Sequence, residues 1–229
     1  MTLKEFKSKL TAIEKLSFVQ SKRKSNTGIG YTLETLLGIK ENNIKLPDLG
    51  EIELKSKRKN VFTYVTMFTF NSGVWKIHQS DVIKKYGYKD KQKRKALKCF
   101  VRVTPNAQGL YLKVTKQSLQ MYHTDKTLIA EWDATTLLQY FSAKLPSLIL
   151  VLANTRRDEN DREEFHYNEA YLLKTPSKTG LLKLIEQGFV VVDLRMHLKS
   201  SCGVRNRGTA FRVEEKNLIQ CFAEKIKLL

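Results

Sequence analysis

Apolar and polar positions along this chain follow two rhythms, one typical of helices and one typical of strands. Near the N-terminus apolar residues recur at helical spacing, which predicts a first helix within residues 2–20. A second helix is expected over Ile29–Gly38, ending at Gly38. Similar patterns predict helices over Ala134–Lys144 and Gly180–Gln187, and a closing amphipathic helix over Glu214–Lys227.

Other segments alternate apolar and polar residues or form short apolar runs, as strands do. They predict strands at the segment GEIELKSKR (50–58), Val61–Phe70, Thr127–Trp132, Ser147–Ala153 and Phe189–Met196. The mixed-charge segment TRRDENDREE (155–164) is expected to be a solvated loop. Because helices and strands interleave without a strict βαβ repeat, we expect an α/β (mixed α+β) fold.

Charge changes this picture most. The 229 residues carry 41 Lys and Arg against 23 Asp and Glu, a net charge of +18, which favours a polyanionic partner such as nucleic acid. A ribosomal or merely soluble basic protein is the alternative. The longest apolar runs are strand-length, so no membrane span is expected. Three cysteines without metal-ligand spacing, and no signal peptide at the N-terminus, favour the reducing cytoplasm.

Candidate chemistry lies in the segment Pro47–Lys55. Along a strand Glu53 and Lys55 share one face, while Ile52 and Leu54 face the core. Asp48 would lie roughly 16 Å from Glu53 in a straight strand. A bend at Gly50, the flexible residue between them, would bring the two carboxylates together.

Converging carboxylates suit a hard cation such as Mg²⁺, with the backbone carbonyl of Leu54 as a third oxygen ligand. Lys55 would then orient a water molecule or stabilise phosphate oxygens. A bare P-D-x4-E-x-K pattern is only moderately specific. A solvated strand face with an incidental salt bridge is an equal alternative for this segment taken alone.

Two basic segments are candidates for phosphate contact. In the turn before the second helix, Arg23, Lys24 and Asn26 would contact phosphate through cations and backbone amides; a solvated basic turn has equal weight. The run Lys89–Lys98 favours contact without sequence choice. On the late strand Asp193 and Arg195 share a face, so Arg195 either contacts DNA or forms a structural ion pair.

Three motifs in order resemble the MvaI/BcnI family of type II restriction endonucleases, which is related to the mismatch-repair nickase MutH. They are Asn26-Thr-Gly-Ile-Gly-Tyr-Thr-Leu-Glu34 with Leu36-Leu37, then Pro47-Asp48 with Glu53 and Lys55, and finally Arg207-Gly-Thr-Ala-Phe-Arg212. The resemblance spans about residues 20–215. It implies a restriction-endonuclease-like core, a mixed central sheet flanked by helices, with two lobes clamping DNA.

The resemblance also implies roles for single residues. Asp48 and Glu53 match the family's metal ligands, Lys55 its catalytic lysine, and Glu34 a carboxylate that lines the active site. A single bilobal nuclease over residues 1–229 is expected, with a catalytic lobe mainly at 1–80 plus part of 100–175 and a recognition lobe including about 190–215. Family members act as monomers that nick each strand in turn at short sites in double-stranded DNA.

The chain departs from the family in its last motif, because Arg207 replaces a histidine. Arginine donates two hydrogen bonds to guanine and asparagine pairs with adenine, so base reading should change. We expect the DNA-facing residues to be Arg195, Arg205, Asn206, Arg207, Thr209 and Arg212.

The sequence therefore predicts a Mg²⁺-dependent site-specific deoxyribonuclease, with Mn²⁺ as a substitute and a cognate DNA methyltransferase encoded nearby. Two alternatives are a MutH-like repair nickase and a non-catalytic DNA-binding protein. The Asp48, Glu53 and Lys55 set disfavours the second alternative.

Overall fold

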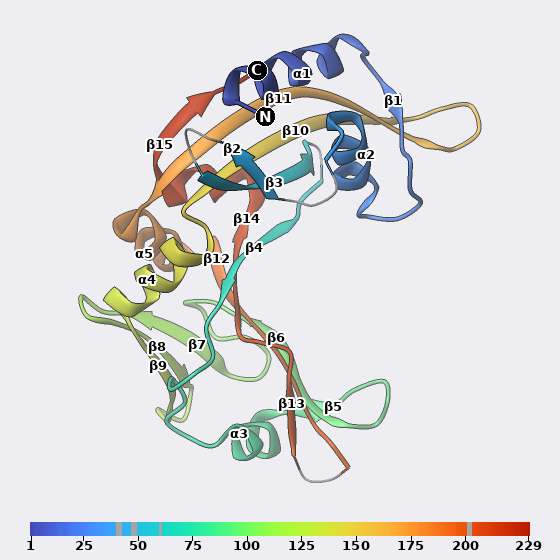
Figure 1. The fold of residues 1–229 in the computed structure, drawn as a ribbon. Coiled ribbons are helices and arrows are strands. Elements are labelled where there is room, and N and C mark those ends of the chain that lie inside the picture. The colour runs from blue at the N-terminus through green and yellow to red at the C-terminus, as the bar shows by residue number, and fades with distance from the viewer. Residues whose placement is uncertain (40–42, 47–49, 60, 201–202) are drawn as a thin grey trace. The chain divides into compact units, whose positions relative to one another are not determined.

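The computed structural model of the chain describes residues 1–39, 43–46, 50–59, 61–200 and 203–229 (Figure 1). It divides into two compact units. Unit 1 comprises Met1–Phe62, Pro146–Thr175 and Phe222–Leu229, and unit 2 comprises Thr63–Leu145 and Pro176–Cys221. Within the described ranges, no helix combines the length and apolar character needed to cross a membrane.

Unit 1 is built on a mixed sheet with the strand order β1-β11-β10-β3-β2, in which β15 also pairs with β11. Its strands are β1 (Val19–Gln20), β2 (Asn43–Leu46), β3 (Gly50–Arg58), β10 (Ser147–Arg157), β11 (Glu163–Pro176) and β15 (Phe222–Lys227). Strand β3 runs parallel to β10 and antiparallel to β2. Hydrogen bonds on both sides therefore hold β3 in place.

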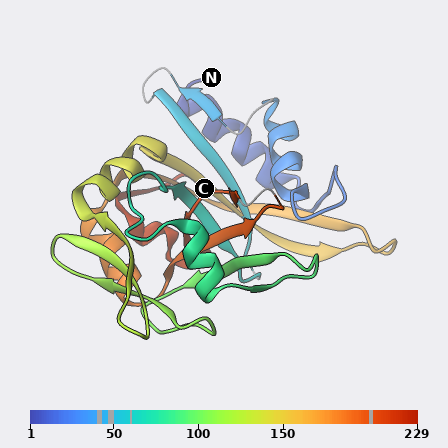
Figure 2. The ribbon, with the colours of Figure 1, turned by 90° about the horizontal axis from the view of Figure 1, so that it is seen from below.

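Two helices, α1 (Leu3–Lys15) and α2 (Gly28–Leu37), cover one face of this sheet (Figures 1 and 2). A capping box of Thr2 and Glu5 begins α1, and Gly38 ends α2 at φ 74°, a conformation that favours glycine. The core between helices and sheet includes Phe6, Leu10, Ile29, Leu33, Ile52, Leu54, Ile149, Val151 and Tyr167. Even-numbered positions of β3 thus face the helices.

Unit 2 contains a sheet with the order β4-β14-β12-β6-β5, in which β13 pairs with β12, and a smaller sheet β7-β8-β9. The strands of the larger sheet are β4 (Tyr64–Thr69), β5 (Tyr88–Lys89), β6 (Lys95–Val101), β12 (Val190–Leu198), β13 (Val204–Asn206) and β14 (Ala210–Glu214). The smaller sheet has β7 (Leu110–Val114), β8 (Ser118–His123) and β9 (Leu128–Asp133). Helices α3 (Gln79–Tyr86), α4 (Ala134–Lys144), α5 (Lys178–Glu186) and the 3₁₀ helix η1 (Glu215–Cys221) complete the unit.

Aromatic rings fill much of the core of unit 2. Phe211 of β14 stacks on Phe68 with ring centroids 4.7 Å apart, and it meets the edge of Trp132 at 5.6 Å. The Trp132 indole is fully buried and donates to the Phe70 carbonyl at 3.1 Å, so its polar atom has a partner. On β12 the even-numbered Val190, Val192, Leu194 and Met196 are buried on this side.

The closing helix predicted over Glu214–Lys227 is wrong. The structure instead has η1 over Glu215–Cys221 and then strand β15 over Phe222–Lys227, which pairs with β11. Only Phe222 of β15 is buried, so its pattern carried no strand signal. The free edge of β11 supplied hydrogen-bond partners, and this long-range pairing overrode local helical preference.

The solvated loop predicted over 155–164 is largely a β-hairpin. Strand β10 continues to Arg157 and β11 starts at Glu163, so only a short turn between them is left. Salt bridges between the strands neutralise the charges, including Arg156 with Glu164 at 2.6 Å. Cross-strand pairs of opposite charge let a highly charged segment extend a ladder.

Candidate active site and nucleic-acid interface

On strand β3 two side chains of opposite charge lie next to each other. Ile52 and Leu54 are buried against the helices, whereas Glu53 and Lys55 lie on the opposite face and form an ion pair with each other. Their side chains remain 29% and 21% exposed, so both are reachable from solvent. This matches the alternation expected for a strand and places a carboxylate and an ammonium at one spot on a rigid sheet.

Of the other two predicted metal ligands, Asp48 and Leu54, the structure describes only Leu54. Asp48 lies outside the described residues, so its convergence with Glu53 stays a prediction. Leu54 lies between Glu53 and Lys55 and opposite Ile149 of β10. Among the described residues no cluster of three His, Cys, Asp or Glu side chains is arranged to hold a metal ion. A metal site that includes Glu53 and Asp48 therefore stays a prediction.

Glu34 lies on α2, one turn after Gly30. A Cβ placed on Gly30 would lie 3.6 Å from the Glu34 Oε1 atom and 3.6 Å from the Ser56 Oγ atom. Glu34 therefore lies near the helix-facing side of β3, and in the described part of the chain it forms no side-chain bond to Glu53 or Lys55. The Ser56 hydroxyl is buried without a hydrogen-bond partner among the described residues.

The basic turn before α2 is held by contacts to the rest of unit 1. The Arg23 guanidinium stacks on the Tyr31 ring at 4.4 Å, a cation–π contact that the sequence did not reveal. The Asn26 carbonyl accepts a hydrogen bond from Arg58 Nη1 at 3.0 Å. Lys24 is exposed. Arg23 and Lys24 thus lie at the surface beside the start of α2.

One face of the larger sheet in unit 2 gathers cations from several strands. Lys98 of β6 lies opposite Arg195 of β12, and Arg195 exchanges hydrogen bonds with the backbone of Arg207 at 3.1 and 3.2 Å. On the same face His197 lies opposite Arg205 of β13. Directly opposed residues in antiparallel strands project to the same side. The face carries Lys98, Arg195, His197, Arg205, Arg207 and Arg212, and we call it the basic face.

A β-bulge sets the direction of Arg207. From Asn206 to Ala210 the chain takes four steps, while β12 takes three between the opposite residues Met196 and Asp193. Gly208 adopts φ +94° inside this bulge, a conformation that favours glycine. The Arg207 side chain is exposed and, in the described part of the chain, has no ion-pair partner.

Asn206 and Thr209 turn their polar atoms inward. Thr209 is fully buried and donates to Asn71 Oδ1 at 2.9 Å, while Asn206 Nδ2 donates to the same atom at 3.0 Å. Asn206 Oδ1 accepts from the Gly208 amide at 2.8 Å, and Trp75 Nε1 donates to Asn71 Oδ1 at 2.8 Å. Both residues thus help to hold the bulge in shape, and their predicted contact with DNA stays a prediction.

Asp193 lies beneath two arginines of the basic face. Its carboxylate is 3.1 Å from Arg212 Nη1 and 3.8 Å from Arg195 Nε, so the structural ion pair considered from the sequence is present. Burial raises the pKa of Asp193 above its usual range, and the two guanidinium groups oppose that rise only in part. Asp193 therefore fixes the positions of Arg195 and Arg212.

Comparison with known proteins decides the family. The sequence model of the MvaI/BcnI restriction endonuclease family matches residues 7–222, nearly the whole chain. The chain belongs to the MvaI/BcnI restriction endonuclease family. It is therefore a deoxyribonuclease that binds DNA, and the predictions of family and enzyme class are confirmed.

Solved structures confirm the fold of this MvaI/BcnI family member. The complex of restriction endonuclease MvaI with its cognate DNA substrate is similar with a TM-score of 0.72 and 23% sequence identity, covering 99% of this chain and 98% of that chain. MvaI in the absence of DNA gives a TM-score of 0.63 at 23% identity, covering 100% and 98%. No curated protein matches the chain. The predicted mixed α/β class is correct.

Proposed function

We propose that this chain is a Mg²⁺-dependent type II restriction endonuclease that cleaves both strands of a short specific site in double-stranded DNA. The observation that carries this proposal is the pairing of Glu53 with Lys55 on the open face of β3 in a member of a nuclease family. Family members typically use divalent metal ions.

The donor atoms around this position suit Mg²⁺, because they are carboxylate and carbonyl oxygens. Asp48, Glu53 and the Leu54 carbonyl would hold the ion, and Mn²⁺ would substitute. When bound, the ion activates water for attack and offsets charge on the phosphodiester. Glu34, in the second half of α2 and toward the helix-facing side of β3, would be the further carboxylate that lines the site.

Lys55 has two tasks in this proposal. In the free protein its ammonium forms an ion pair with Glu53, which would limit repulsion if Asp48 converges on the same point. When DNA and metal bind, Lys55 would turn to the phosphate and donate a hydrogen bond to an oxygen on which charge develops. The chain would leave 5′-phosphate and 3′-hydroxyl ends.

Recognition of the site falls to unit 2 in this proposal. Arg207, aimed by the bulge, and Arg205 are exposed and would contact base edges or phosphates, with Arg195 and Arg212 beside them. Asn206 and Thr209 would act as positioning residues. In unit 1, Arg23, Lys24 and the Asn26 turn would contact the DNA backbone.

The test is incubation of the protein with a mapped supercoiled plasmid and Mg²⁺, followed by sequencing of the fragment ends. We expect fixed ends at one short sequence, nicked circles that precede linear DNA if a monomer cuts one strand at a time, and no cutting with excess chelator. A repair nickase would stop at nicked circles or require a partner. Uncut plasmid under all divalent metals would leave only a DNA-binding protein.

A further inference from the structure

The turn between β5 and β6 carries an unusual concentration of positive charge. Residues 89–98 contain five lysines and one arginine against a single acid, Asp90. Lys89, Lys91 and Lys93 are exposed, and within the described residues none of the three has an ion-pair partner. Like charges this close repel each other weakly in water, and an anionic partner would relieve that repulsion.

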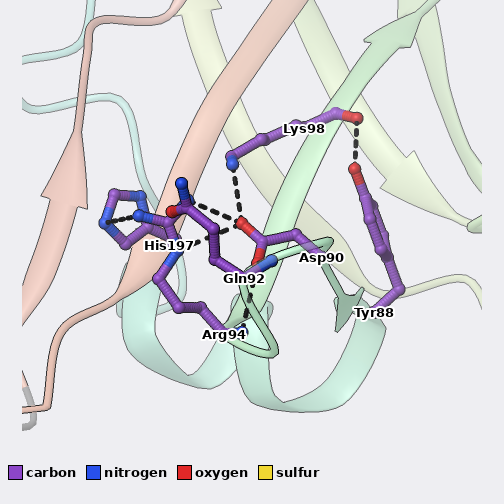
Figure 3. Close-up of polar contacts among 6 residues, drawn as sticks. All are labelled: Tyr88, Asp90, Gln92, Arg94, Lys98 and His197. Carbon is purple, nitrogen blue, oxygen red and sulfur yellow. Dashed lines mark hydrogen bonds and ion pairs between the residues drawn. The ribbon is translucent and has the colours of Figure 1, made fainter.

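Asp90 provides structural support for the turn (Figure 3). Its carboxylate accepts hydrogen bonds from the backbone amides of Gln92 and Arg94 at 2.9 and 3.1 Å. It also forms ion pairs with Arg94 Nη2 at 2.7 Å and with Lys98 Nζ at 2.8 Å. These hydrogen bonds hold the pKa of Asp90 far below its usual range. The acid thus stays ionised and shapes the turn without neutralising the three exposed lysines.

The turn is joined to the basic face. Arg94 Nη1 lies 3.4 Å from His197 Nε2, and because arginine can only donate, His197 accepts through this nitrogen. Burial and the neighbouring cations lower the pKa of His197, in agreement with a neutral ring. The Tyr88 hydroxyl donates to the Lys98 carbonyl at 3.1 Å. The lysine turn is therefore a fixed extension of the face that carries Arg195, Arg205 and Arg207.

We propose that Lys89, Lys91 and Lys93 form a phosphate-binding surface that grips duplex DNA without regard to its sequence. Lysines reach phosphates as flexible point charges and carry no information about bases. Figures 1 and 2 show the turn extending past α3 at one edge of unit 2. At this edge the lysines can reach the sugar-phosphate backbone of a DNA duplex. This inference rests on the proposed function, since it assigns one part of the DNA-binding surface.

The test compares two triple variants with the same loss of charge. One is Lys89→Gln, Lys91→Gln, Lys93→Gln. The matched control, Lys113→Gln, Lys116→Gln, Lys126→Gln, removes three exposed lysines from strand β7 and from the turns of the smaller sheet in the same unit. Each set contains one residue with positive φ, Lys93 at 57° and Lys126 at 69°, so any backbone cost is shared.

Binding to a random-sequence duplex of 30 base pairs is measured in chelator, so that no cleavage occurs, over a series of salt concentrations. Each lost phosphate contact lowers the slope of log affinity against log salt by about 0.9. The turn variant should lose up to about 2.7 slope units, and the control should keep the parent slope.

Equal slopes for the turn variant and the parent, or an equal loss in the control, overturn this inference. Cleavage of the mapped plasmid by the parent is scored separately with Mg²⁺. If the parent binds and cuts but the turn variant keeps its slope, only the phosphate-binding surface is wrong. If the parent neither binds nor cuts DNA, the proposed function and this inference fall together.

Discussion

The two units assemble their candidate functional residues in different ways. In unit 1, Glu53 and Lys55 lie two positions apart on one strand and contact each other directly. In unit 2, Lys98, Arg195 and Arg207 come from three separate stretches of the chain and meet only across strands. Hydrolysis needs a few atoms at one point, which strand periodicity can supply. DNA recognition needs a wide surface, which only pairing between distant segments can supply.

This difference predicts that cleavage and recognition can be lost separately. Lys55→Ala should lower the cleavage rate by about 10²–10³-fold, because a donor to the developing charge is removed, with little loss of DNA affinity. Single-turnover cleavage and gel-shift binding measure the two effects. The control is Lys7→Ala, at an exposed lysine of α1 in the same unit, for which a change of about twofold or less is expected. A Lys55→Ala variant that lost DNA binding and cleavage together would contradict the separation of the two functions.

Arg207→Ala tests the role of unit 2 in DNA recognition. If Arg207 donates two hydrogen bonds to a base, its loss should cost roughly 1–3 kcal/mol of discrimination between the cognate site and a site with one changed base pair. Cleavage competition between the two substrates reports this ratio, and Lys116→Ala of the same unit is the control. Unchanged site preference and rate would show that Arg207 does not read the DNA.

A change at Asn71 tests how the bulge that directs Arg207 is held in shape. Asn71→Ala leaves the donors of Trp75, Asn206 and Thr209 without their common acceptor, which should cost about 1–2 kcal/mol of unfolding free energy. Asn71→Asp keeps the acceptor oxygen and should restore most of that stability. Urea unfolding measures both variants. If the alanine variant were as stable as the parent, the shared acceptor would have no structural importance.

The smallest effects are expected at Asp193, where two readouts should move in opposite directions. Asp193→Asn frees the guanidinium groups of Arg195 and Arg212, so discrimination should fall severalfold. Removal of one negative charge should at the same time strengthen binding to random DNA and steepen its salt slope by up to about 0.9. A variant that is only destabilised would lose both site discrimination and binding to random DNA. A decrease in both would therefore contradict the role assigned to Asp193.

Much of unit 1 was predictable because its signals are local. Glycine at position 38, the helical spacing of Leu33 and Leu37, and the alternation around Glu53 each act within a few residues. The prediction for the closing segment failed because its structure depends on a distant strand. Residues 222–227 became a strand because β11 offered an edge, and no pattern within the segment could show that edge.

The same reasoning explains the structural contacts that sequence patterns did not reveal. Asn71 lies 138 positions from Thr209 along the chain, and nothing in either neighbourhood marks them as partners. Asn206 and Thr209 were assigned outward roles because their chemistry suits DNA. The inward roles became visible only when the bulge and the buried network were in place.

The family, the chemistry available on β3 and the positive charge that favours a nucleic-acid partner could all be predicted from the sequence. Those properties depend on residue type, on short motifs and on the order of those motifs along the chain. The folded backbone was needed to show which arginines share a face, which polar side chains turn inward, and how Asp193 holds Arg212 in place. Such arrangements depend on contacts between segments far apart in the chain, and only the folded backbone brings those segments within hydrogen-bonding distance.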